Sequence, residues 1–247
     1  MTILEEYRAS DMEVARTADL MRVVPRSRKS VLDIGARDGH FSKLLTSCFE
    51  SVTALDLELP TFDIPGVTPV AGDVTRLQFD DSSFDCIFCT EVLEHIPDLR
   101  KACREIIRVA KHDIVIGVPF EQDTRVGRCT CPACRKTNPP WGHVNTFTEA
   151  RLLDLFQGTR HVSTSFVGTT TSRTTALAAF LMDRGLNPWG AYNQSEPCIF
   201  CGGRLQEPVG RRFWHKVCSS VAIRMDLLQE RFAQPKPNWI HIVFSKD

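Results

Sequence analysis

Four cysteines form two pairs whose spacing is typical of metal-binding knuckles. Cys131 and Cys134 enclose two residues, as do Cys198 and Cys201, and two glycines follow the second pair. This spacing lets both thiolates of a pair surround one tetrahedral ion, so the sequence predicts a Zn²⁺ site with these four ligands. Four thiolates leave no coordination position for a substrate, and the role of the ion would be structural.

Other interpretations of the cysteines stay open. Cys129 is an alternative to Cys131 as a ligand. The pairs can also be unrelated reduced thiols, or a dithiol that cycles through a disulfide. Five more cysteines lie in apolar strand or helix patterns and are expected to be core residues: Cys48, Cys86, Cys89, Cys103 and Cys218.

A glycine-bearing loop and two later aspartates are arranged as a nucleoside cofactor requires. The loop follows the apolar segment Val31-Leu32-Asp33-Ile34 and contains Gly35 and Gly39, while Asp56 and Asp73 end or follow the next two apolar segments. Glycines let a ligand approach the backbone where a helix begins, and a carboxylate can accept hydrogen bonds from two ribose hydroxyls. We therefore predict Asp56 on the ribose and Asp73 near the base.

Carboxylates and imidazoles cluster farther along the chain. Glu91, Glu94 and His95 lie within five residues, and His143 follows the predicted fifth strand. Oxygen and imidazole ligands suit Mg, Mn, Fe or Zn, so Glu91, Glu94 and His95 are candidates for an additional divalent cation. Alternatively, Glu94 and His95 bond to the backbone and fix a turn. His143 and Glu91 are the predicted catalytic residues, His143 as a general base because imidazole titrates near neutral pH; a structural role for His143 is an equal alternative.

Apolar segments of strand length alternate with helical patterns and must position these groups. The expected strands are residues 30–34, 52–55, 67–71, 84–89, 114–118, 161–168 and 239–244. The expected helices are 11–24, a helix around 41–45, 99–109, 148–156 and 214–232. This order predicts an α/β fold with a mainly parallel seven-stranded sheet and helices on both faces.

Two aperiodic stretches interrupt this order. Residues 121–142 are rich in Cys, Pro, Arg and Gly, residues 187–209 are also irregular, and each stretch contains one of the cysteine pairs. We predict one domain over residues 1–247, in which 121–142 and 187–209 are insertions that form a joint zinc-binding lid.

Composition excludes several classes of protein. The chain has 247 residues, 43% of them hydrophobic, and its 30 basic and 30 acidic residues give a formal net charge of zero. No large one-sign field is present to attract nucleic acid, which is a disfavoured partner. No apolar stretch is long enough to span a membrane, and the first residues do not resemble a signal peptide, so a cytoplasmic protein is expected.

Four successive motifs resemble those of the class I S-adenosylmethionine-dependent methyltransferases of types 11 and 23. The motifs are Val31-Leu32-Asp33-Ile34-Gly35, Ala54-Leu55-Asp56, Ala71-Gly72-Asp73 and the run FDCIFCTEVLEHI that starts at Phe84. The resemblance implies a doubly wound Rossmann-like fold and S-adenosylmethionine as cofactor. It places Asp33 and Gly35 near the methionine part, Asp56 on the ribose, Asp73 at the adenine, and Thr90 and Glu91 at the transfer site.

The other expected cofactor residues are Gly39, Leu57, Gly72 and Val74. One departure is visible: the family commonly has glycine where this chain has Arg37, which can bend the loop differently or offer a cation to the cofactor carboxylate. A nicotinamide enzyme is the competing interpretation of the loop, and the run from Glu91 to Ile96 argues against it.

The function expected from this resemblance is methyl transfer, most simply to an oxygen of a small metabolite, sugar or natural-product intermediate. The run around Glu91 is also similar to that of metal-assisted O-methyltransferases of ubiquinone synthesis and of small-RNA ribose 2′-O-methyltransferases. RNA methylation is therefore an alternative. A zinc-stabilised binding module without catalysis is a third, favoured if Arg37 blocks the cofactor.

Overall fold

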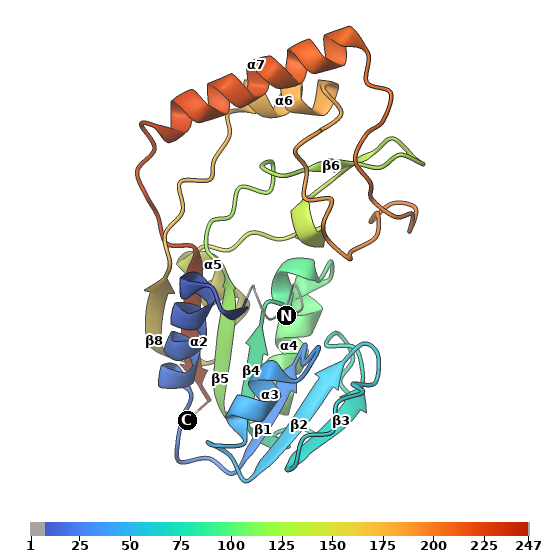
Figure 1. The fold of residues 1–247 in the computed structure, drawn as a ribbon. Helices are drawn as coiled ribbons and strands as arrows, with labels where there is room; N and C mark the ends of the chain where they lie inside the picture. Colours follow the sequence, from blue (N-terminus) through green and yellow to red (C-terminus); the bar gives the residue numbers. More distant parts are fainter. Residues whose placement is uncertain (1–7, 247) are drawn as a thin grey trace. The chain divides into compact units, whose positions relative to one another are not determined.

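A computed structural model describes residues 8–246 and divides them into two compact units (Figure 1). The first unit comprises residues 8–120, 147–168 and 237–246, and the second comprises 121–146 and 169–236. Both predicted insertions lie in the second unit, together with the segment 210–236. The organisation as a single domain with two insertions stays a prediction.

The first unit is built on a seven-stranded sheet, as predicted. Its strands are β1 (Ser30–Ile34), β2 (Ser51–Asp56), β3 (Val67–Ala71), β4 (Phe84–Thr90), β5 (Ala110–Pro119), β8 (Arg160–Val167) and β9 (Trp239–Ser245). Their order is β3-β2-β1-β4-β5-β9-β8. Pairing is parallel from β3 to β5, and β9 runs antiparallel to both β5 and β8. The mainly parallel sheet expected from the strand pattern, and the Rossmann-like fold that the resemblance implies, are confirmed.

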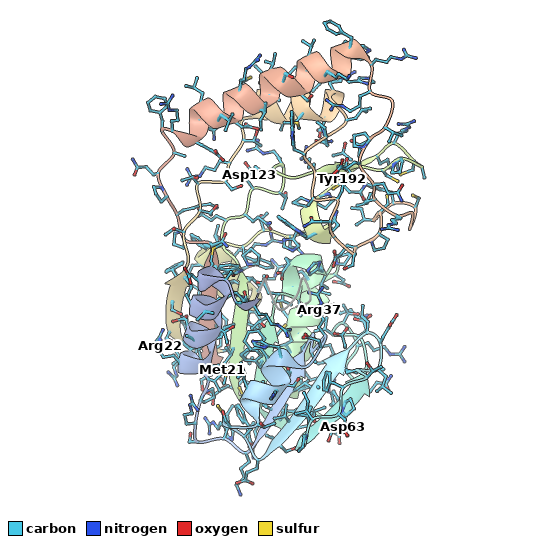
Figure 2. All side chains as sticks on the ribbon, viewed as in Figure 1. Met21, Arg22, Arg37, Asp63, Asp123 and Tyr192 are labelled. Carbon is cyan, nitrogen blue, oxygen red and sulfur yellow. The ribbon has the colours of Figure 1, made fainter. Side chains whose placement is uncertain are left out.

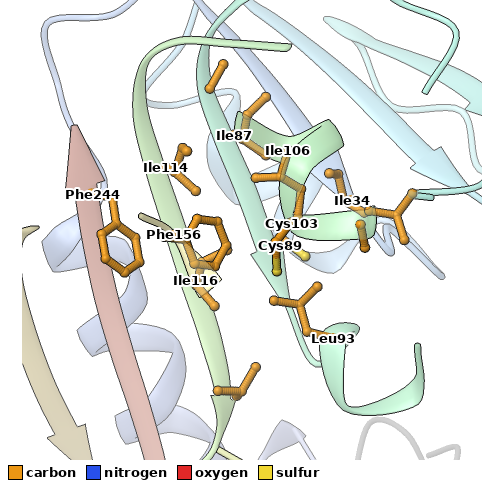
Figure 3. Packing of buried hydrophobic residues seen from close by; sticks show 14 of the residues in the cluster. Ile34, Ile87, Cys89, Leu93, Cys103, Ile106, Ile114, Ile116, Phe156 and Phe244 are labelled. Carbon is orange, nitrogen blue, oxygen red and sulfur yellow. The ribbon is translucent and has the colours of Figure 1, made fainter. Parts of the chain in front are cut away.

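Helices cover both faces of this sheet. They are α2 (Asp11–Val23), α3 (His40–Leu45), α4 (Leu99–Val109) and α5 (Glu149–Leu155). On one face α4 buries Leu99, Ala102, Cys103, Ile106 and Val109, which recur at the three- and four-residue intervals of a helical stripe. Figure 3 shows Ile106 and Cys103 beside Ile87, Ile114 and Ile116 of the central strands. Helices α2 and α3 pack on the opposite face, with Leu20, Leu45 and Phe88 in a second cluster.

Capping side chains fix where these helices begin. The hydroxyl of Ser10 accepts a hydrogen bond from the amide of Glu13 at the start of α2, and Asp98 caps α4 in the same way. Thr148 accepts from the amide of Arg151 and caps α5.

The second unit has little regular structure apart from two helices. It contains the short strands β6 (Cys129–Thr130) and β7 (Thr137–Asn138), the 3₁₀ turn η2 (Pro140–Gly142), and helices α6 (Ala176–Arg184) and α7 (Phe213–Glu230). Helix α7 agrees with the prediction, whereas α6 was not predicted. No helix of residues 8–246 has the length and apolar content needed to cross a membrane.

Candidate functional site

The ends of four parallel strands bring the predicted cofactor residues to one edge of the first unit. The register pairs Ile34 with Leu55, Asp56 with Ala71 and Ile34 with Cys89. The loop after β1, the end of β2, the turn after β3 and the end of β4 therefore lie at the same edge. This is the edge at which open α/β sheets bind ligands.

The loop after β1 depends on glycine at two positions. Gly35 and Gly39 have φ of 79° and 78°, a left-handed conformation that side chains disfavour. A Cβ added to Gly35 would lie 2.2 Å from Cγ2 of Val92, so this position has no space for a side chain. Arg37, labelled in Figure 2, is also left-handed, with φ of 50°. The loop thus adopts at Arg37 a conformation that the expected family glycine would adopt more readily.

Asp56 is held in place by backbone amides and keeps capacity for a ligand. Its Oδ2 accepts from the amide of Arg37 at 2.8 Å, and its Oδ1 accepts from the amide of Leu57 at 2.7 Å. Each carboxylate oxygen has two lone pairs, so one acceptor site remains on each. The carboxylate is partly exposed and oriented before any ligand binds. This arrangement fits the two vicinal hydroxyls of a ribose.

Asp33 lies beneath the loop and is buried. Ser42 of α3 donates a hydrogen bond to its Oδ2 at 2.6 Å, which ties the strand to the helix that follows. Burial raises the pKa of Asp33 to about 7, and the nearby charge of Asp56 also raises it. The predicted role near the methionine part of the cofactor stays a prediction.

The turn after β3 holds Asp73 through its own backbone. Oδ1 of Asp73 accepts from the amide of Thr75 at 2.8 Å, and the amide of Gly72 donates to the carbonyl of Asp56 at 2.8 Å. The Asp73 side chain is exposed, whereas that of Val74 packs in the core. If Val74 contacts a cofactor, its backbone is the available part.

The segment after β4 places the carboxyl groups of Glu91 and Glu94 close together, and the two groups differ in their surroundings. Thr90 is buried at the end of β4, Glu91 adopts a left-handed φ of 55°, and the 3₁₀ turn η1 (Leu93–His95) follows. Oε1 of Glu91 lies 3.7 Å from the guanidinium of Arg16. Burial raises the pKa of Glu91 to about 7, although Arg16 lowers it.

Glu94 is the more deeply buried carboxyl group. It is fully buried, and neither of its side-chain oxygens has a hydrogen-bond partner among residues 8–246. Burial, and then the charge of Glu91, raise its pKa well above the ordinary value. The backbone amide of Glu94 itself lowers this pKa, so the structural alternative considered from the sequence, in which Glu94 and His95 bond to the backbone, stays open.

A buried ion pair at the same edge was not predicted. Arg16 of α2 donates from Nε and Nη2 to the two carboxyl oxygens of Glu13. Its guanidinium also lies over the rings of Phe41 and Trp239, 5.4 and 5.6 Å from their centroids. The available signal was a pair of opposite charges three residues apart on a helix whose apolar stripe is imperfect.

A histidine–aspartate pair was also missed. Thr90, Gly117 and His241 are neighbours across β4, β5 and β9. Nδ1 of His241 lies 2.7 Å from Oδ2 of Asp19, and its Nε2 has no hydrogen-bond partner in the described chain. Burial lowers the pKa of His241, although the hydrogen bond and the charge of Asp19 raise it. Asp19 and His241 are 222 residues apart in sequence, and no spacing pattern connects them.

In the second unit the two cysteine pairs converge, as predicted. Sγ atoms of Cys131 and Cys201 are 3.7 Å apart, those of Cys134 and Cys198 are 3.6 Å apart, and all four lie within 4.8 Å of one another. Thiolates on a tetrahedral ion with Zn–S bonds of about 2.3 Å are separated by about 3.8 Å. A disulfide would need about 2.05 Å. The four thiols therefore fit a zinc ion.

The two knuckles have the same backbone structure. The amide of Arg135 donates to the carbonyl of Cys131 at 3.0 Å, and that of Gly202 donates to Cys198 at 2.8 Å. Arg135 and Gly202 both adopt a left-handed φ, 62° and 69°. The fifth thiol, that of Cys129, is buried and accepts from Nε2 of Gln194 at 3.3 Å. Cys131, not Cys129, therefore completes the cluster.

His143 belongs to the second unit and is buried. Its Nδ1 lies 2.6 Å from Oε1 of Gln122 and donates to it, because an amide oxygen only accepts; in the neutral imidazole the lone pair is then on Nε2.

Asp123 and Tyr192 of the second unit are labelled in Figure 2. The hydroxyl of Tyr192 accepts from the amide of Thr130 at 2.9 Å, so Tyr192 supports the strand that leads into the first knuckle.

Comparisons with known proteins point to one family. Residues 32–116 match the family model described as "Methyltransferase domain". The uncharacterized methyltransferase YcgJ of Bacillus subtilis is 36% identical over 98 residues, which cover 36% of this chain and 39% of that protein. A demethylmenaquinone methyltransferase of Renibacterium salmoninarum is 34% identical over 98 residues, covering 38% of this chain and 40% of that protein. The chain thus matches about two fifths of the length of these curated relatives.

The similarity in fold extends over more of the chain. The crystal structure of YcgJ from Bacillus subtilis covers 94% of this chain and 98% of its own, with a TM-score of 0.57 and 16% identity. At this identity the likeness concerns the fold alone. The matched segment 32–116 contains the loop after β1, Asp56, Asp73 and the run after β4.

Proposed function

We propose that this chain, which carries a domain of the class I S-adenosylmethionine-dependent methyltransferases, transfers a methyl group to an oxygen of a small metabolite, sugar or natural-product intermediate. The proposal depends on Asp56, whose carboxylate is oriented by the amides of Arg37 and Leu57 and keeps one acceptor site on each oxygen. The neutral overall charge favours a small acceptor over nucleic acid.

Each residue at this edge of the sheet binds a different part of the cofactor. Asp56 accepts from the ribose hydroxyls, Gly35 and Gly39 let the methionine part approach the backbone, and Asp73 with its neighbouring amides borders the adenine. Bound S-adenosylmethionine supplies an activated methyl group on a sulfonium, so the protein has mainly to align the acceptor and remove its proton.

Glu91 and His143 are the proposed proton acceptors. A carboxyl group with a pKa of about 7 exists in both protonation states at neutral pH, which suits general acid–base catalysis. In neutral His143 the proton is on Nδ1, so Nε2 is the nitrogen that would accept a proton. Glu91→Gln should lower kcat more than it raises KM for S-adenosylmethionine, whereas a residue that only binds cofactor would raise KM.

The test of the proposal is calorimetric titration with S-adenosylmethionine, followed by measurement of S-adenosylhomocysteine after incubation with small hydroxylated acceptors. We expect saturable heat with one binding site per chain. Absence of heat and of any thermal shift would remove the enzymatic function. Binding of S-adenosylmethionine without methylation of small molecules, together with methylation of RNA, would show that the acceptor is RNA.

A structural Zn²⁺ ion at the four-cysteine cluster is the second part of the proposal. Support comes from the sulfur separations of 3.6 and 3.7 Å and from the matched backbone of the two knuckles. Elemental analysis should find about one zinc per chain. Cys201→Ser should lower that content, whereas Cys218→Ser, a matched exchange on α7, should leave it unchanged.

An additional divalent cation at Glu91, Glu94 and His95 is proposed on one observation. The carboxyl group of Glu94 is fully buried without a hydrogen-bond partner in the described chain, and such a group is either protonated or bound to a cation. Mn²⁺ should raise the melting temperature of the native protein and not that of Glu94→Gln. Equal melting of both proteins with and without Mn²⁺ would show that Glu94 is a buried neutral acid.

A further inference from the structure

Helix α7 of the second unit exposes an apolar stripe beside basic side chains. Trp214, Val217, Val221 and Leu228 are exposed and recur at intervals of three, four and seven residues, which places them on one side of the helix. Phe213, next to the start of this stripe, is 82% exposed, and Leu228 is 59% exposed. Large apolar side chains in such a row mark an interaction surface.

The opposite side of α7 is already used. Ser219 and Ala222 are buried, and Ser219 receives a hydrogen bond from the guanidinium of Arg211. A Cβ on Gly185, just after α6, would lie 2.6 Å from Cβ of Ser219, so α6 and α7 are in close contact there. Helix α7 is therefore anchored by one face and has the stripe on the other.

The charges beside the stripe are mostly of one sign. Lys216, Arg224 and Arg231 are exposed. At about 100° per residue, Arg224 and Arg231 fall within about 40° of Val217, at the edge of the stripe, whereas Lys216 lies about 100° away on the flank of the helix. Glu230 is the exposed acidic side chain of the same segment, whereas Asp226 is partly buried and accepts from the hydroxyl of Thr174. The chain as a whole has no net charge, so this basic edge is a local feature.

We propose that the outer face of α7 binds to the surface of an anionic lipid bilayer. A helix with Trp, Phe and Leu on one side and Lys or Arg along the edge lies in the plane of such a surface, with apolar groups among the acyl chains and cations at the phosphates. This inference is independent of the proposed methyl transfer.

Other occupants fit less well. A second copy of the chain on a two-fold axis would bring Lys216, Arg224 and Arg231 close to the same residues of its partner, and like charges would repel. Nucleic acid would pair with the cations but leave Val217, Val221 and Leu228 in water. A bilayer surface satisfies both kinds of side chain without requiring a shaped pocket.

The test is co-sedimentation of the full chain with vesicles of phosphatidylcholine, alone or mixed with phosphatidylserine. We expect binding to the mixed vesicles that weakens as salt is added. Val217→Ser combined with Leu228→Ser should weaken partitioning about tenfold. Arg224→Glu should weaken it at least about fivefold, since each basic residue near an anionic surface contributes about that factor.

Matched controls separate this effect from general damage. Val162→Ser in β8 and Lys101→Glu in α4 replace an exposed apolar and an exposed basic residue of the first unit and should leave partitioning unchanged. All the substituted residues are exposed, so melting temperatures should stay close to that of the native protein. No binding to mixed vesicles, or binding that the α7 exchanges do not alter, overturns the proposal. A concentration-dependent dimer abolished by the Val217 and Leu228 exchange, without vesicle binding, would assign the face to a second copy.

Discussion

In the first unit the predicted cofactor residues lie at the ends of strands whose side chains fill two hydrophobic clusters, whereas in the second unit the four thiols lie among very few apolar residues. The cluster around the knuckles consists of Ala191, Leu205, Tyr192 and the cysteines 129, 131, 134 and 198. In the first unit, therefore, the core holds the site. In the second, the site takes the place of a core, as in small zinc-stabilised domains.

The largest effect should follow from removing the proposed Zn²⁺ ion. Apparent zinc-binding energies of about 10–16 kcal/mol in zinc-finger peptides far exceed what so small an apolar cluster contributes. A chelator, or Cys198→Ser, should abolish hydrogen-exchange protection in residues 129–138 and 198–203 and leave that of β1, β4 and β5 intact. Cys218→Ser should change neither. Persistent protection of both knuckles after chelation would mean that the ion is not what stabilises the second unit.

A substitution in the hydrophobic core of the first unit should destabilise that unit and leave the zinc site of the second unit unchanged. Ile87 is fully buried between α4 and the neighbouring strands, so Ile87→Ala should cost about 2–5 kcal/mol in unfolding of the first unit. Zinc content should not change. Thermal melting with parallel elemental analysis checks both, with the exposed Val162→Ala as a control expected to stay within about 0.5 kcal/mol. Loss of zinc in Ile87→Ala would show that the two units depend on one another.

A buried acid in the first unit should make stability depend on pH. The pKa of Asp33, raised by burial to about 7, is higher in the folded than in the unfolded chain, where aspartate titrates near about 4. Between these values the folded chain binds more protons, so the contribution of Asp33 to stability falls as pH rises from about 4 to about 7. Asp33→Asn removes this cost and keeps the contact with Ser42 available.

The expected outcome is a higher melting temperature for Asp33→Asn than for the native protein at pH 8, with little difference at pH 4. Asp80→Asn, an exposed exchange in the same unit, should leave the melting temperature unchanged at both pH values. A constant difference between Asp33→Asn and the native protein at all pH values would mean that Asp33 is not protonated on folding.

The smallest effects concern two arginines in left-handed conformations, one in each unit. Arg37 has φ of 50° and Arg135 has φ of 62°, and glycine adopts such angles without the cost of about 1 kcal/mol that a side chain incurs. Arg37→Gly should stabilise the first unit by up to about 1 kcal/mol, as measured by melting. Arg135→Gly should slow zinc loss to a chelator, whereas Arg204→Gly, an exposed matched exchange, should not.

Much of the first unit was predictable because its strands and turns are determined by residue patterns that are local in the sequence. Each expected strand is present, with ends shifted by a few residues at most in all but β5, which begins at Ala110 and not near residue 114. Asp56 and the glycines could be placed in turns at the ends of strands because turns after parallel strands restrict which residue types fit; their roles toward a cofactor stay predictions. Two contacts could not be predicted: that of Arg16 with Glu13 and that of Asp19 with His241. Both depend on how α2 packs on the sheet.

The second unit was harder to predict for a related reason. The cysteine pairs follow a spacing rule, so the cluster was identified. Helix α6 has nine residues between the cap Thr175 and Gly185, and much of its burial comes from Ala178 and Ala179 against α7, which leaves a weak periodic signal. The left-handed residue of the first knuckle is Arg135, whereas that of the second knuckle is Gly202. Because the residue types differ, the sequence does not show that the two knuckles share the same backbone structure.

The most direct test of the account is the affinity of Asp56→Ala for S-adenosylmethionine, measured by calorimetry beside Asp80→Ala as a control. Two hydrogen bonds to a charged carboxylate are expected to be lost, each contributing about 1.5–3 kcal/mol, so the Kd should rise at least about a hundredfold for Asp56→Ala and stay unchanged for Asp80→Ala. Equal affinity of Asp56→Ala and the native protein would contradict the assignment of the ribose to the end of β2.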